Sequence, residues 1–172
     1  MRVRAADWAR DAEGIRAIDT SFTTDRVYRF ARERGGLGFA LALLTREALT
    51  KSYELPADDP GEGSFVAEAD SGIIGFGRVE PPAWNGRAAV SHLYVAPADR
   101  GRGVGRALLD ALDAHAAGAS ARCLFVETQN VNYPAVQFYL ACGFALVGLD
   151  QSFYDPVEHS GEIALFLTRS LA

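Results

Sequence analysis

The part of the sequence best suited to bind an anion is a glycine-rich segment, Arg100-Gly101-Arg102-Gly103-Val104-Gly105-Arg106. It lies between a predicted strand that stops at Pro97 and a predicted helix that begins at the end of the segment. The N–H groups of a first helical turn have no acceptor within the helix, and glycines let a ligand oxygen approach them closely. Three arginines add positive charge to a chain whose formal net charge is −5. The segment therefore predicts a phosphate-binding loop.

We compare this segment with three known patterns of phosphate-binding loop. A P-loop requires Gly-Lys-Ser/Thr at the helix start, which Gly105-Arg106-Ala107 does not supply. The dinucleotide fingerprint Gly-x-Gly-x-x-Gly is disfavoured because its third glycine falls on Arg106 or Leu108, although Glu127 ends a strand about 20 residues on, where a ribose-binding acid would stand. The third pattern, Arg/Gln-x-x-Gly-x-Gly/Ala, is that of an acyl-coenzyme A pyrophosphate loop, and residues 100–105 match it at every fixed position.

With this loop, three motifs in order resemble the GCN5-related N-acetyltransferase (GNAT) superfamily over roughly residues 65–167. They are the strand end Leu93-Tyr94-Val95-Ala96-Pro97, the loop itself, and the block Asn132…Phe138-Tyr139-x-x-x-Gly143-Phe144. The resemblance implies an α/β fold with a mixed, mostly antiparallel central sheet, a parallel splayed strand pair and helices on both faces. It also implies direct transfer of an acetyl group from acetyl-CoA to an amine, without a covalent acyl-enzyme.

A narrower likeness is to streptothricin acetyltransferases. It is carried by Glu127–Ala135, Gly148-Leu149-Asp150, Tyr154 and Gly161–Phe166, and by Trp84-Asn85 and Ser21-Phe22. One position departs from that branch, since Ser91 stands where an acidic residue is typical. The likeness implies a small cationic acceptor with a primary amine, and a streptothricin-type antibiotic is the first candidate. Two alternatives stay open: acetylation of a protein N-terminal or lysine amine, as in ribosomal-protein acetyltransferases, and an acyl-CoA-binding sensor without turnover.

The resemblance also assigns roles to single residues. Backbone groups of Leu93, Tyr94 and Val95 and the side chain of Asn132 would bind the pantetheine arm, and the loop from Arg100 to Arg106 would bind the pyrophosphate. Tyr139 would act as general acid toward the thiolate, and Glu127 as general base or ammonium anchor. Each residue also has a structural interpretation: Asn132 as a helix N-cap, Tyr139 as a packing aromatic and Glu127 as a surface strand end.

Four further residues are candidate contacts for the acceptor: Phe22, Trp84, His92 and Tyr154. Each of the three aromatic residues is individually better explained by core packing than by contact with an acceptor. His92 titrates near neutrality and so invites a role as base, but its strand neighbours favour a packed histidine. Neither cysteine lies in a pattern typical of a nucleophile, and no cluster has the spacing of metal ligands, so no metal is predicted.

The elements that must position these residues follow from hydrophobic periodicity. Helix spacing at Ile15, Ile18 and Phe22 predicts an amphipathic helix. The segment 26–44 allows a hairpin turning at Gly35-Gly36-Leu37-Gly38 or two short helices, and its alternation favours the hairpin. The other predicted elements are strands at 64–69, 73–79, 88–95 and 123–127, a helix ending at Gly118, a helix over 135–141, and closing strands at 144–149 and 162–168.

Length and composition bound the rest. The 172 residues, 49% of them apolar, predict one domain. The resemblance implies acceptor-side elements in 1–55 and an acetyl-CoA-binding core in 64–169. Seventeen Lys and Arg against 22 Asp and Glu, without a long basic run, argue against a nucleic acid partner. No apolar run approaches the roughly 18 residues of a membrane span, and the start lacks a secretory signal. We therefore expect a cytoplasmic protein. The resemblance to the superfamily is also compatible with a homodimer.

Overall fold

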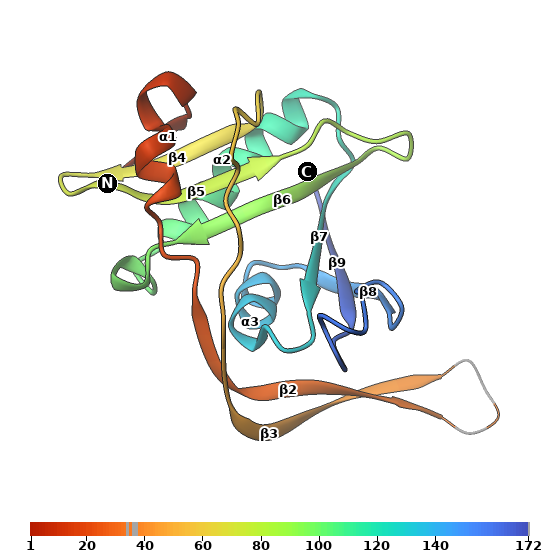
Figure 1. The fold of residues 1–172 in the computed structure, drawn as a ribbon. Coiled ribbons are helices and arrows are strands. Elements are labelled where there is room, and N and C mark those ends of the chain that lie inside the picture. Colours follow the sequence, from red (N-terminus) through yellow and green to blue (C-terminus); the bar gives the residue numbers. More distant parts are fainter. Residues whose placement is uncertain (34, 36–37, 172) are drawn as a thin grey trace. The chain divides into compact units, whose positions relative to one another are not determined.

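Three α-helices and nine strands make up the computed structural model, which describes residues 1–33, 35 and 38–171 (Figure 1). The chain divides into a first unit, residues 1–21, 52–126 and 168–172, and a second unit, residues 22–51 and 127–167. None of the described helices is long and apolar enough to cross a membrane. In chain order the elements are β1 (Arg2–Ala5), α1 (Trp8–Arg16), β2 (Phe22–Arg32), β3 (Phe39–Lys51), β4 (Ser64–Ala69), β5 (Gly72–Val79), β6 (Arg87–Val95), the 3-10 turn η1 (Pro97–Asp99), α2 (Val104–Gly118), β7 (Cys123–Gln129), α3 (Tyr133–Ala141), β8 (Ala145–Asp150) and β9 (Ala164–Ser170).

The sheet of the first unit follows the strand order β1-β4-β5-β6-β7. Its first three pairings are antiparallel, and β6 pairs with β7 in parallel. The parallel ladder runs from Arg87↔Cys123 to Ala89↔Phe125, whereas β6 continues along β5 to Val95. The predicted mixed sheet with a parallel strand pair is therefore confirmed, and the parallel ladder is short.

Helices cover both faces of this sheet (Figure 1). Val66 of β4 packs in a cluster with Ile15 of α1, and the next residue, Ala67, packs with Val104 and Leu108 of α2. Because successive side chains of a strand point to opposite faces, α1 and α2 lie on opposite sides. All five side chains are at most 3% exposed, so both layers contribute to the core.

A partly buried ion pair joins α1 to β1, a short strand that the periodicity does not predict. Nη1 and Nη2 of Arg4 donate to the Oδ2 and Oδ1 atoms of Asp11 at 2.6 and 2.8 Å, and its Nε donates to Oε2 of Glu68 in β4 at 2.9 Å. The N–H of Asp7 also donates to Oδ2 of Asp11, at 2.9 Å. The hydrogen bonds from Arg4 hold the pKa of the Asp11 carboxyl below its usual range. This pair therefore connects β1, α1 and β4.

The second unit begins with a long hairpin. β2 and β3 pair antiparallel from Phe22↔Lys51 to Arg32↔Phe39, which confirms the hairpin over the alternative of two helices. Of the predicted turn, Gly36 and Leu37 lie outside the described residues. The prediction that Phe22 belongs to the first helix is wrong, because α1 ends at Arg16 and Phe22 starts β2. The β-branched threonines that follow it favour a strand.

Asn130 ties this hairpin to the rest of the second unit, where the strand order is β7-β9-β8. Its Nδ2 donates to the carbonyl of Tyr28 in β2 at 3.0 Å, and its carbonyl accepts from the Tyr28 N–H at 3.0 Å. Its Oδ1 accepts from the N–H of Ile163, just before β9, at 2.8 Å. The residue is 2% exposed, and both polar atoms of its side chain form hydrogen bonds, so it fixes β2 beside the end of β7.

Candidate functional site

The glycine loop of the first unit has the shape that an anion site needs. It follows η1, and Gly101 and Gly103 adopt φ values of 73° and 85°, a left-handed conformation that other L-residues rarely take. Among the described residues, nothing lies within 4 Å of a Cβ placed on either glycine, so this side of the loop is open. α2 begins at Val104 directly after Gly103 and presents the N–H groups of its first turn there.

The three loop arginines do not share one role. Arg100 turns toward the backbone: its Nε donates to the Val95 carbonyl at 2.9 Å, and its Nη2 reaches the Asp19 carbonyl at 3.5 Å. The side chain of Arg102 is 71% exposed, with Nη1 3.5 Å from Oδ1 of Asp99, and Arg106 is exposed. Arg100 therefore supports the course of the loop, and Arg102 and Arg106 add further positive charge at its surface.

The end of β6 contains the three residues of this unit whose backbone is predicted to bind the pantetheine arm. Leu93, Tyr94 and Val95 pair with Gly77, Phe76 and Gly75 of β5. The ring of Tyr94 also packs 6.0 Å from the ring of Tyr53. The strand is thus held on one edge by β5, and contacts of its backbone with a cofactor stay a prediction.

His92 and Trp84 also lie in the first unit, in different environments. The half-buried ring of His92 lies 5.7 Å from the Phe76 ring, with Nδ1 3.1 Å from Oγ of Ser91. Burial, assisted by the charge of Arg78, lowers the pKa of His92, which favours the packed, neutral histidine. Trp84 is 97% exposed in the turn between β5 and β6, so the core interpretation of this residue is wrong. Trp84 lies in a tight turn in which the N–H of Gly86 donates to the carbonyl of Ala83 at 2.8 Å.

In the second unit, Glu127 and Tyr154 meet. Glu127 lies half-buried in β7, and the hydroxyl of Tyr154, 27 residues later between β8 and β9, donates to its Oε1. Burial raises the pKa of the Glu127 carboxyl, and the hydrogen bond from Tyr154 acts in the opposite direction. A carboxylate with a raised pKa is a stronger base near neutral pH than an exposed one. The interpretation of Glu127 as an ordinary surface glutamate is therefore not favoured.

Asn132, Tyr139 and Phe22, also in this unit, show the structural roles expected for them. Oδ1 of Asn132 accepts from the N–H of Ala135 at 3.1 Å, which confirms it as the N-cap of α3. Tyr139 is 8% exposed, with its ring 5.3 Å from that of Phe144, and Phe22 is 7% exposed. The cofactor role of Asn132 and the acid role of Tyr139 stay predictions beside these contacts.

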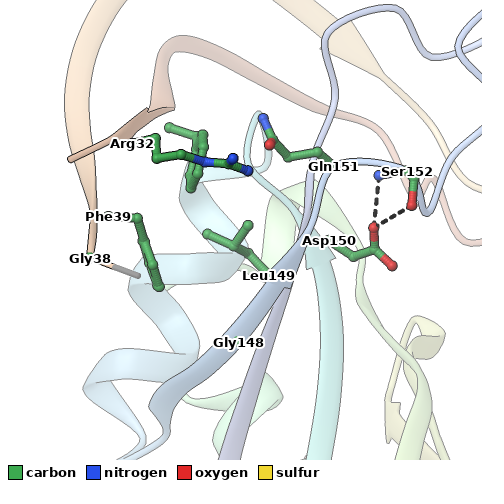
Figure 2. A pocket seen from close by; sticks show the side chains of 9 residues that line it. Arg32, Gly38, Phe39, Gly148, Leu149, Asp150, Gln151 and Ser152 are labelled. Atoms are coloured by element: carbon green, nitrogen blue, oxygen red, sulfur yellow. Dashed lines mark hydrogen bonds between the residues drawn. The ribbon is translucent and has the colours of Figure 1, made fainter. Parts of the chain in front are cut away.

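The second unit also contains an open hollow of about 610 Å³. Figure 2 shows Arg32 of β2, Phe39 of β3 and Leu149 of β8 around it. The rings of Phe30 and Phe39 stand 5.8 Å apart at its hairpin side. None of the predicted site residues lines this hollow. Among the described residues, no group of three or more His, Cys, Asp and Glu side chains could hold a metal ion.

Comparison with known proteins identifies the family. The profile of the acetyltransferase (GNAT) family matches residues 40–144. The chain belongs to the GNAT family. A streptothricin acetyltransferase of Streptomyces lavendulae is 36% identical over 170 residues, which cover 92% of this chain and 89% of that protein.

Two solved structures resemble this GNAT chain over almost its whole length. The crystal structure of a nourseothricin acetyltransferase has a TM-score of 0.87 and 40% identity, covering 99% of this chain and 98% of that one. A Bacillus anthracis protein crystallised with acetyl coenzyme A has a TM-score of 0.84 and 25% identity, with 98% of each chain covered. The predicted family, the GNAT fold and the acetyltransferase class are thereby confirmed.

Sequence reasoning missed two features of this GNAT protein. It placed Glu127 and Tyr154 separately in the site but did not predict that their side chains meet. It also treated Arg100 as one of three equivalent cations. No local signal indicates the first feature, because Glu127 and Tyr154 lie 27 residues apart. No local signal indicates that Arg100 turns to the backbone.

Proposed function

We propose that this GNAT protein transfers the acetyl group of acetyl-CoA to a primary amine of a small cationic acceptor, with a streptothricin-type antibiotic as the first candidate. The observation that carries this proposal is the likeness to streptothricin and nourseothricin acetyltransferases over nearly the whole chain, at 36% and 40% identity. The half-buried Glu127 carboxyl supports it, because a raised pKa suits a group that must accept a proton from an ammonium.

The donor's pyrophosphate is assigned to the loop from Arg100 to Arg106. The loop fits this group because its glycine side is open and the first turn of α2 offers N–H groups, while Arg102 and Arg106 supply charge. The bound donor supplies an activated acetyl thioester. Leu93–Val95 and Asn132 are assigned to its pantetheine arm.

Proton movements are assigned to the second unit. The acceptor arrives as an ammonium, and Glu127 takes one proton from it, directly or through a water molecule. The neutral amine nitrogen then attacks the thioester carbon, the C–N bond forms and the C–S bond breaks. The leaving thiolate takes the hydroxyl proton of Tyr139, since a phenol with an ordinary pKa near 10 is protonated at neutral pH. The nitrogen that attacked gives up its extra proton, which passes through water to the tyrosinate, so the products are the neutral amide and the free thiol and the phenol is restored.

Acetyl-CoA is expected to stabilise the protein in a thermal-shift titration, whereas NADH is not. A ligand that binds only the folded state adds about 2.7 kcal/mol at a hundredfold excess over its Kd. The two ligands share a pyrophosphate and an adenosine group, so the comparison tests the type of loop rather than its charge. Equal stabilisation by NADH, or no stabilisation by acetyl-CoA at millimolar concentration, would contradict the assignment.

Tyr139→Phe is expected to lower kcat by about tenfold or more, without a change in acetyl-CoA affinity. The phenyl ring keeps the contact with Phe144, and the melting temperature of the variant is measured to check that it folds. Tyr133→Phe on the same helix is the matched control, because its hydroxyl contacts Arg26 instead. The measurement is release of free thiol at saturating substrates, and a fully active variant would show that water can replace Tyr139.

Release of free thiol with a panel of acceptors separates the proposal from its alternatives. The panel contains a streptothricin, short diamines, peptides with a free N-terminal amine, and peptides with an internal lysine. Turnover of the antibiotic and the diamines supports the proposal, and turnover of the peptides alone favours a protein acetyltransferase. Binding of acetyl-CoA without thiol release for any acceptor would indicate a sensor.

A further inference from the structure

The connection between β8 and β9, residues 151–163, is ordered by its own hydrogen bonds. At its start Oδ1 of Asp150 accepts from both the N–H and the Oγ of Ser152, at 2.7 Å each. In its middle the carbonyl of Asp155 accepts from the N–H of His159 at 2.8 Å, and the carbonyl of His159 accepts from the N–H of Glu162 at 3.0 Å. The segment that bears Tyr154 thus has a defined course.

Aromatic rings frame Tyr154 on this connection. The edge-on ring of Phe153 lies 5.2 Å from it and 5.7 Å from the ring of Phe166 in β9. The ring of His159 lies 5.6 Å from Tyr154, also edge-on. Such edge-to-face contacts fix ring orientation, so the Tyr154 hydroxyl is directed from a rigid frame.

An ion pair anchors the far end of the same connection. Nζ of Lys51, the last residue of β3, lies 2.5 Å from Oε1 of Glu162, with the two side chains 17% and 11% exposed. Nδ1 of His159 lies 3.7 Å from Oε2 of Glu162. The hairpin and the connection are therefore held together behind the ring of Tyr154.

We propose that Tyr154 is a positioning residue for acetyl transfer: its hydroxyl holds Oε1 of Glu127 and fixes the plane of the carboxylate for proton transfer at Oε2. This inference rests on the proposed function and goes beyond it, because Tyr154 acts through Glu127 rather than on the acceptor. A free carboxylate rotates about its last two torsions, and a donor on one oxygen restricts both. Fixing a base in this way is part of the orientation that speeds a bound reaction.

The same bond determines the direction of a pH effect. Burial raises the pKa of Glu127, and Tyr154 opposes this by donating to the charged form. The titratable groups behind the Tyr154 ring are His159, Glu162 and Lys51, of which the last two form an ion pair with each other. Removing the Tyr154 hydroxyl therefore shifts the pKa of Glu127 further upward. As the pH falls, the carboxylate is then protonated, and stops acting as a base, at a higher pH than in the wild type.

Tyr154→Phe tests the proposal because it removes the hydroxyl and keeps the ring between Phe153 and His159. We expect kcat to fall about tenfold, the KM for acetyl-CoA to hold, and the acid limb of the pH–rate profile to move to higher pH. Titration of the Glu127 carboxyl by ¹³C NMR, in protein without substrates, should show the same upward movement. Tyr133→Phe is the matched control for loss of a phenol, and melting temperatures check folding.

Three outcomes are distinct. The role of Tyr154 is overturned, and the proposed function stays intact, if Tyr154→Phe turns over a streptothricin or a diamine with an unshifted acid limb and its NMR titration is also unshifted. A wild-type protein that acetylates no amine refutes the proposed function, and the role of Tyr154 with it. A shifted limb and a shifted titration, with acetyl-CoA binding unchanged, support the assignment.

Discussion

Glu127→Gln is expected to lower turnover of the acceptor amine by about 10²-fold or more and to leave acetyl-CoA affinity unchanged. Glutamine has the size of glutamate, and its Oε1 can still accept from Tyr154, but it takes no proton and attracts no ammonium. The loss is therefore confined to base strength and charge. The measurement is kcat from thiol release, with the Kd of acetyl-CoA from calorimetry on the same preparation.

Glu158→Gln is the matched control, since that glutamate is exposed on the connection between β8 and β9. An unchanged rate in Glu127→Gln would remove Glu127 from the mechanism.

The thermal stability of Glu127→Gln supplies a separate check. Because the pKa of Glu127 is raised in the folded state, its charge lowers stability as the pH rises through that folded pKa. The variant should therefore melt at a higher temperature than wild type at pH 8, and the difference should vanish near pH 4.

Asp11→Ala is expected to lower the free energy of unfolding by about 3 kcal/mol, which approaches the effect of breaking a buried ion pair. Asp11 is 2% exposed, and the Arg4 side chain that it binds is 14% exposed, so the substitution leaves a partly buried guanidinium with Glu68 as its remaining acidic partner. Urea denaturation of both proteins at pH 7 gives the difference. Glu13→Ala, on an exposed position of the same helix, is the control and should change stability little.

The pH dependence of this effect follows from the sign of the pKa shift. The pKa of Asp11 is lowered in the folded state, chiefly by hydrogen bonds from Arg4, so its contribution is present above the unfolded pKa of about 3.9. It is lost as the pH falls through the folded pKa. The difference in free energy of unfolding between wild type and Asp11→Ala should therefore become smaller in acid. A difference that stays constant down to pH 2 would refute an origin in the charge of Asp11.

Local patterns in the sequence determined the elements that carry the site. The glycine loop was predictable because a left-handed residue strongly favours glycine, and Gly101 and Gly103 both adopt positive φ. Asn132 was predictable as an N-cap because a short polar side chain before Pro134 satisfies first-turn N–H groups. The hairpin of β2 and β3 followed from alternation. In each case the physical cause lies within a few residues of the chain.

Only the tertiary structure decided which side chains meet. The bond between Tyr154 and Glu127 spans 27 residues and that between Arg4 and Glu68 spans 64. Arg100 reaches the carbonyls of Val95 and Asp19, the latter 81 residues away, because the fold brings these acceptors close to it. Such pairings depend on burial, which strengthens hydrogen bonds and penalises lone charges, and burial is a property of the folded chain and of no short segment in it.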